Sequence, residues 1–248
     1  MPHCAYVLRI ADTSLILAQR LGEWVGHAPA IEEDLGLANV SLDLLGQARM
    51  LLSYAGELEG RGRSEDDLAY LREESEFLNA TLVEQPNGDF GQTVVRQFLV
   101  DAWQLELYEQ LLESKDPRLA EIAAKAVKET RYHLRYSAGW LVRLGDGTDE
   151  SHARVQDALT RLWPLTGELF STDEVDREIA QAGIGPAAEA LLPGWSARVA
   201  AVFAEARLAA PVMSPFSWHG KQGRHSEHLG FVLAEMQSLH RAHPGATW

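Results

Sequence analysis

The sequence contains a single cysteine, Cys4, so the chain cannot form an internal disulfide bond. One thiol in 248 residues suits a reducing compartment, and we expect a cytoplasmic protein. No apolar run approaches the ~20 residues that a membrane-spanning helix needs. The first six residues also lack the basic and apolar regions of a signal peptide. We therefore expect neither a membrane-spanning segment nor a secretory leader.

Positive charge is also scarce. The chain has 22 lysines and arginines against 36 aspartates and glutamates, which gives a net charge of −14. Proteins that bind nucleic acid normally present a basic face, so the balance argues against nucleic-acid partners and against recruitment to anionic lipid. The sequence also lacks a Gly-x-Ser-x-Gly elbow, a Gly-x-Gly-x-x-Gly turn, a Walker-type loop and a Cys-x-x-Cys pair.

Apolar residues recur at helical spacing almost throughout, and no stretch of useful length alternates as a strand does. The pattern predicts helices over residues 6–26, 32–55, 64–82, 90–113, 117–144, 149–169, 173–182, 186–209 and 224–242. The segment 211–223, which contains Pro215, Phe216 and Trp218, is predicted to be an irregular loop.

Loop lengths predict how these helices are connected. Short loops join the first helix to the second and the helix at 90–113 to that at 117–144, so each pair forms an antiparallel hairpin. A crossover of about thirty residues separates the pairs, which is the ferritin-like four-helix topology. We therefore expect an all-α fold in a single domain over residues 1–248. Its core bundle would lie at about 6–144 and its accessory helices at about 149–242.

Polar residues interrupt the apolar faces of the four long helices at mid-helix depth. Ferritin-like bundles often hold two metal ions there, through a carboxylate from each of two helices and a Glu-x-x-His pair from each of the other two. The candidate ligands are Asp12, Asp43, Asp101, Glu129 and His133.

The ligand pattern is incomplete, however. Three residues after Asp43 stands Gly46, three after Glu129 stands Tyr132, and one histidine is available where two are needed. The residues favour a buried polar network, in which the carboxylates pair with His133 and with arginines such as Arg49 or Arg131, because buried charges must be paired. An autonomous di-metal oxygenase or ferroxidase at these positions remains the alternative.

Two further histidines, His225 and His228, have the i, i+3 spacing of a metal-binding pair at the start of the last helix. The sequence places no further set of ligands in view for them. Capping of the helix and contact with solvent therefore account for them better than a metal site.

With these residues in view, the whole chain resembles the non-catalytic, ferritin-like C subunits of bacterial phenylacetyl-CoA ring epoxidases, which are multicomponent monooxygenases of aromatic degradation. The stretches that carry the resemblance are 19–24 (QRLGEW), 26–29 (GHAP), 42–49 (LDLLGQAR), 82–88 (LVEQPNG), 131–135 (RYHLR), 227–230 (EHLG) and 233–237 (LAEMQ).

The resemblance implies a division of labour. A sister A subunit of the same fold would hold the di-iron centre and bind phenylacetyl-CoA, and the C subunit would pair with it without metal or any other cofactor of its own. A B subunit would bridge the heterodimers, and a reductase with FAD and an iron–sulfur cluster would supply electrons from NADPH. The complex would insert one oxygen atom of O2 across the ring of phenylacetyl-CoA.

The resemblance also places part of the CoA-binding surface on this subunit. One stretch lies in the crossover, where Phe77 could pack on the ligand and Asn79 could donate a hydrogen bond, and a second includes Arg177, which could meet a phosphate. As ordinary helix residues, Phe77 would instead be core and Arg177 would pair with Asp173 or Glu174. The two stretches are Glu76, Phe77, Leu78 and Asn79, and Arg177, Glu178 and Ile179.

Two expectations concern assembly. The second helix is apolar on nearly every side, and large aromatics such as Trp103, Trp140 and Trp163 are spread along the chain. Obligate interfaces bury wide, largely apolar areas, so we expect a heterodimer with the A subunit and a homodimer when the chain is alone. A stand-alone CoA-thioester binder is a third possibility.

Overall fold

A computed structural model describes residues 1–212 and 216–246 of the chain. Within these ranges the chain folds into α-helices joined by turns and short 3-10 segments, and no strand is formed. The helices group into two compact units. The first unit combines residues 1–86 with the segment that begins at Trp218, and the second lies within residues 87–217. The prediction of an all-α fold, with two long antiparallel hairpins and one long crossover as in ferritin-like chains, is confirmed.

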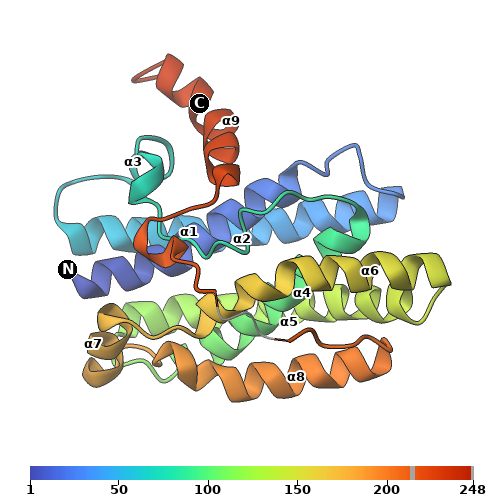
Figure 1. Cartoon of the computed structure of the whole chain (residues 1–248). Coiled ribbons are helices and arrows are strands. Elements are labelled where there is room, and N and C mark those ends of the chain that lie inside the picture. Colours follow the sequence, from blue (N-terminus) through green and yellow to red (C-terminus); the bar gives the residue numbers. More distant parts are fainter. Residues whose placement is uncertain (213–215, 247–248) are drawn as a thin grey trace. The chain divides into compact units, whose positions relative to one another are not determined.

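The first unit is built on a long antiparallel hairpin. Helix α1 spans Pro2–Gly22 and helix α2 spans Ile31–Glu59, and the two lie side by side over most of their length (Figure 1). Pro2 suits the first turn of α1 because the amide hydrogen it lacks would have no helical partner there. Gly60 ends α2 in the left-handed conformation (φ 69°). Both helices bury large aliphatic side chains, including Val7, Ile10, Leu17, Leu44 and Leu51.

Two shorter helices complete this unit. Helix α3 spans Glu65–Tyr70 and helix α9 spans Glu227–Ala242, and they pack on each other (Figure 1). The rings of Tyr70 and His240 stack with centroids 4.9 Å apart. Arg241 Nε donates to the carbonyl of Tyr70 over 3.1 Å. These contacts tie the C-terminal helix to the crossover that follows α2.

The second unit contains the other long hairpin and three further α-helices. Helix α4 spans Phe90–Leu111 and α5 spans Pro117–Gly145. They are followed by α6 (Asp149–Leu162), α7 (Glu174–Ala182) and α8 (Leu192–Glu205). Helix α4 lies at the centre and contacts α5, α6 and α8. A short loop joins α4 to α5. It ends at Asp116, which caps α5 by accepting from the backbone amides of Arg118 and Leu119.

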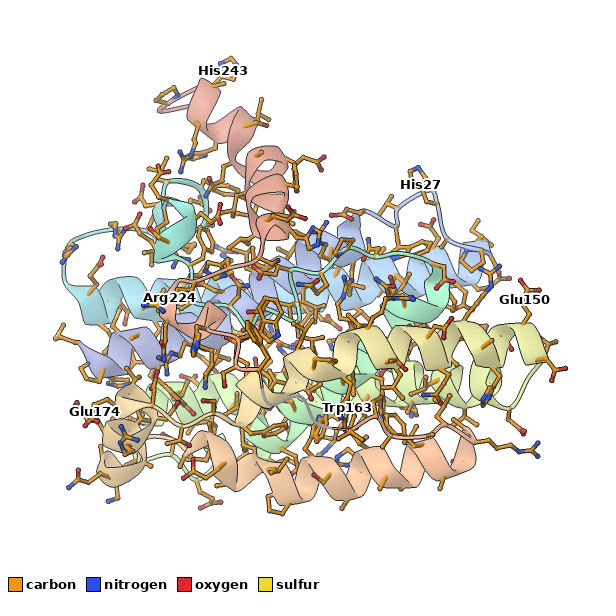
Figure 2. All side chains as sticks on the ribbon, in the orientation of Figure 1. His27, Glu150, Trp163, Glu174, Arg224 and His243 are labelled. Atoms are coloured by element: carbon orange, nitrogen blue, oxygen red, sulfur yellow. The ribbon has the colours of Figure 1, made fainter. Side chains whose placement is uncertain are left out.

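An aromatic cluster packs the accessory helices of this unit onto α4. Trp163, labelled in Figure 2, lies 5.5 Å from the Trp195 ring and 5.8 Å from the Phe203 ring. Trp195 also donates its indole N–H to the carbonyl of Leu99 on α4 over 3.0 Å. A large ring whose N–H is hydrogen-bonded is an effective core residue, and Trp195 thereby connects α8 to α4.

Most predicted helices occur, with shifted ends. Helix α1 begins at Pro2 rather than near residue 6 and ends at Gly22 rather than near residue 26. The predicted helix over 64–82 is wrong beyond Tyr70, because a 3-10 helix at Glu74–Glu76 and an extended segment replace it. In the predicted loop, Pro215 lies outside the described residues, and a 3-10 helix spans Gly220–Gln222. Nothing in the described part of the chain combines the length and hydropathy that a bilayer-spanning helix requires.

Candidate functional site

Asp12 on α1 is completely buried and bound to an arginine. Its carboxylate forms a two-pronged ion pair with Arg72, in which Nη1 donates to Oδ2 over 3.0 Å and Nη2 donates to Oδ1. The same carboxylate accepts the backbone N–H of Leu78 over 2.8 Å. Asp12 is 0% exposed and Arg72 is 1% exposed. Both oxygens of the first candidate metal ligand are therefore engaged by donors within the protein.

Arg72 joins Asp12 to the crossover. Its guanidinium lies 4.1 Å from the centre of the Phe77 ring and also donates to the carbonyls of Leu68 and Glu76. A buried guanidinium is tolerated only when its N–H groups and charge are satisfied, and the surroundings of Arg72 meet both needs. We call Asp12 and Arg72 the buried ion pair. The sequence pattern did not identify Arg72, since it suggested Arg49 or Arg131 instead.

The crossover residues 77–80 are extended because α1 supplies their hydrogen-bond partners. The N–H of Leu78 donates to Asp12, and the N–H of Ala80 donates to Thr13 Oγ1 over 3.2 Å. Amides paired in this way cannot also donate to carbonyls of the preceding turn, so a helix is excluded here. This is the physical reason that the predicted crossover helix ends early.

The first candidate CoA-binding stretch begins at Glu76, the last residue of the 3-10 helix, and continues into this extended segment. Glu76 is exposed and Leu78 is half-buried, whereas Phe77 and Asn79 are both 0% exposed. Glycine at position 220 allows a second part of the chain to approach, because a Cβ there would overlap the carbonyl oxygen of Asn79. The stretch is thus held in place by its two buried side chains and presents the other two outward.

A second buried pair fixes the C-terminal helix to the crossover. The His225 imidazole lies between the carbonyl of Phe77, 2.8 Å from Nε2, and the carboxylate of Glu84, 3.2 Å from Nδ1. Glu84 also accepts the N–H of Ser226 over 2.9 Å, and its side chain is 0% exposed, like that of His225. His225 is therefore a structural residue, and Ser226 caps α9 by accepting from the N–H of His228.

In the second unit, Asp101 on α4 is the most perturbed carboxyl group. Ser137 Oγ and Gln97 Nε2 each donate to it over 2.7 Å, and it is 0% exposed. Burial raises the pKa of Asp101 to about 6, although the nearby His133 and the two hydrogen bonds oppose this shift. His133 is also completely buried. The hydrogen-bond donors to Asp101 are thus the neutral side chains of Gln97 and Ser137, not the arginines that the sequence suggested.

The other two candidate ligands are less buried than predicted. Asp43 on α2 is partly exposed, and Glu129 on α5, 21% exposed at its side chain, faces Lys125 at 3.9 Å. The arginines suggested as network partners lie elsewhere. Arg49 pairs with Glu65 over 3.2 Å and Arg131 pairs with Glu109 over 2.8 Å, both near the surface. That part of the predicted network is wrong.

These geometries do not fit a di-metal centre. A metal ligand needs free lone pairs directed at a shared point, but Asp12 is neutralised by a fixed guanidinium and both oxygens of Asp101 accept hydrogen bonds. Among residues 1–212 and 216–246, no three His, Cys, Asp or Glu side chains are grouped as metal ligands would be.

The second candidate CoA-binding stretch lies on α7. Arg177 is exposed and pairs with Glu174, its neighbour one turn earlier, over 2.9 Å. Glu174 marks the start of this helix in Figure 2. Glu178 is exposed, and Ile179 is 2% exposed and anchors the helix. Pairing of Arg177 with Glu174 is one of the two roles that the sequence analysis considered for this residue. An exposed guanidinium of this kind can exchange partners at little cost.

Comparison with known proteins agrees with the resemblance. The family model described as "Phenylacetic acid catabolic protein" matches residues 1–248. The chain is also 54% identical, over 244 residues, to the C subunit of 1,2-phenylacetyl-CoA epoxidase from Escherichia coli (strain K12). The alignment covers 98% of this chain and 98% of that relative.

Proposed function

Because the chain belongs to the phenylacetic acid catabolic protein family, we propose that it is the non-catalytic subunit of a phenylacetyl-CoA epoxidase complex in aerobic phenylacetate degradation. Its 54% identity to the C subunit of such an epoxidase supports a place in the complex. The main observation that supports a non-catalytic role is the buried ion pair, in which Arg72 binds the carboxylate of Asp12.

The buried ion pair supports this role on electrostatic grounds. A guanidinium in contact with Asp12 neutralises the carboxylate and places a permanent positive charge where a metal ion would need a ligand. Asp12 would bind a metal ion only if Arg72 were displaced from a buried position, which would leave an unpaired buried charge.

The proposal assigns the chemistry to partners. A ferritin-like A subunit would hold the di-iron centre and the reacting ring, a B subunit would bridge heterodimers, and a reductase with FAD and an iron–sulfur cluster would deliver electrons. This chain would stabilise the A subunit by pairing with it and would self-associate as a homodimer when alone. A cytoplasmic location fits the single buried thiol, Cys4.

We further propose that the two candidate stretches contribute to the surface that meets the CoA part of the substrate. CoA carries several phosphate charges, and Arg177 is an exposed cation whose present partner, Glu174, is also exposed. In the crossover, Glu76 and Leu78 would face the ligand, while Phe77 and Asn79 would fix the backbone from inside. Glu178 and Ile179 would play the corresponding outer and inner roles on α7.

Reconstitution tests the proposal. The A subunit, B subunit and reductase are assayed for phenylacetyl-CoA epoxidation with and without this chain. We expect this chain alone to give no product, and its addition to raise the turnover of the other components. Product formation by this chain with the reductase alone would contradict the proposal and would support the autonomous di-metal oxygenase instead.

A further inference from the structure

One face of α2 carries a seam of residues with the spacing of a coiled coil. Its large members are mostly exposed: Ile31 is 73%, Leu35 61% and Leu42 65% exposed. The buried side chains of α2, such as those of Leu44 and Leu51, lie on other faces. Alternating steps of four and three residues connect the members of what we call the α2 seam: Ile31, Leu35, Ala38, Leu42, Leu45 and Arg49.

Such a seam is costly to leave uncovered. Apolar residues at the a and d positions of a heptad repeat are typical of helices that pack against a second helix. The seam runs for about 27 Å along α2 at a rise of 1.5 Å per residue. Its apolar members, from Ile31 to Leu45, cover about 21 Å of this length. Single exposed leucines need no explanation, but a continuous apolar line indicates an interaction surface.

The seam is complementary to itself in one orientation. In an antiparallel pair, a positions face d positions, so residues whose numbers add up to 80 lie opposite each other. Leu42 of one copy then meets Ala38 of the second copy, and Leu35 meets Leu45 of the second copy, so a large residue faces a small one at the centre. Gly46 leaves room beside the seam, because no atom lies within 4 Å of the position its Cβ would take.

The charged residues at the two ends of the α2 seam are arranged with the same twofold symmetry. The last layer places Arg49 opposite Ile31 of the second copy, next to Glu32 and Glu33 in the first turn of that helix. Arg49 is 77% exposed at its side chain, and its contact with Glu65 uses only Nε. Each end of the pair thus brings a cation to an acidic helix start, where the helix dipole opposes it but the carboxylates attract it. Twofold symmetry forms this contact twice.

We infer that the α2 seam is the surface through which two copies of this chain associate, with antiparallel α2 helices and a twofold axis near residue 40. The inference rests on the homodimer included in the proposed function. It adds the surface, the orientation and the register of that homodimer.

A matched pair of charge substitutions tests the surface. Leu42→Glu lies at the centre of the seam, and Phe231→Glu replaces a similarly exposed residue on α9, 67% exposed against 65%. By analytical ultracentrifugation we expect Leu42→Glu to raise the dimer dissociation constant by at least about 100-fold. Phe231→Glu should change it less than about threefold. Both replaced side chains are exposed, so both variants should keep wild-type circular dichroism.

Cysteine cross-linking tests the orientation. Asn39 flanks the predicted axis, so two copies of Asn39→Cys should form a disulfide-linked dimer under mild oxidation. Arg49 of one copy should lie about 27 Å from Arg49 of the second copy in the antiparallel register, so Arg49→Cys should not cross-link to itself. Wild-type protein is the control, because its Cys4 is buried.

These experiments distinguish a failure of the proposed homodimer from a failure of the α2 seam as its surface. A monomeric wild-type chain would overturn both the homodimer and its surface. A wild-type dimer that Leu42→Glu leaves intact would overturn the surface alone, even if that substitution weakened binding to the A subunit. In a parallel pair each seam residue would meet its own counterpart, so efficient cross-linking of Arg49→Cys would indicate parallel helices and would overturn the register.

Discussion

Replacing Arg72 by methionine should destabilise the first unit strongly. Methionine keeps much of the side-chain volume and can still pack on Phe77, but it leaves the carboxylate of Asp12 buried, at 0% exposure, without its cation. Breaking a buried ion pair by removing one partner costs about 3–5 kcal/mol. A protein of this size loses about 2–4 °C in Tm per kcal/mol, so we expect a fall of about 6–20 °C.

Two further variants make this prediction specific. Arg131→Met removes an arginine of an ion pair of similar length, 2.8 Å to Glu109, but that arginine is 57% exposed. Exposed pairs contribute about 0–1 kcal/mol, so its Tm should change little. The double variant Asp12→Leu with Arg72→Met removes both charges and should be more stable than Arg72→Met alone.

The assay is thermal unfolding followed by circular dichroism, with urea unfolding as the second measurement. The reasoning is refuted if Arg72→Met unfolds within about 1 kcal/mol of the wild type. It is also refuted if the double variant is as unstable as the two single variants added together, because that would show no coupling between Asp12 and Arg72.

Three further predictions concern Asp101, Gly220 and Arg177. Because the pKa of Asp101 is raised to about 6 in the folded chain, its stabilising contribution is complete below pH ~4 and lost as the pH rises through 6. Relative to Asp101→Asn, the wild-type free energy of unfolding should fall by about 3 kcal/mol over that range, and a flat difference would contradict the assignment. Gly220→Ala should destabilise by about 1–3 kcal/mol in urea unfolding, since its Cβ would overlap the carbonyl of Asn79; Gly139→Ala, where nothing lies within 4 Å, is the control. In the reconstituted complex, Arg177→Gln should raise the KM for phenylacetyl-CoA about fivefold with kcat unchanged, and an unchanged KM would remove α7 from the CoA surface.

The long hairpins could be predicted because their determinants are local. Apolar periodicity over four turns or more identifies each helix, and a single residue, Asp116, is enough to place the connection before α5. The burial of Asp12, Asp101 and His133 was equally predictable, since each interrupts an apolar face, and all three are 0% exposed.

The crossover could not be predicted because its structure depends on residues far away in sequence. Leu78 and Ala80 donate to side chains 66 and 67 positions earlier, so no local pattern indicates the extended backbone. Arg72 stands next to Leu71 and Glu73 in a stretch that resembles an exposed helix end. Arg72 is buried only because it pairs with Asp12. Glu84 and His225 are likewise buried because they contact each other, although they lie 141 positions apart in the sequence.

Metal content of the purified chain tests the central claim most directly. The chain is expressed alone in iron-rich medium, and its iron is measured by mass spectrometry and by anomalous scattering at the iron edge. From the proposed non-catalytic role we expect much less than one iron per chain and no anomalous peak near Asp12 or Asp101. About two ions per chain, the content of a working ferritin-like centre, would contradict it.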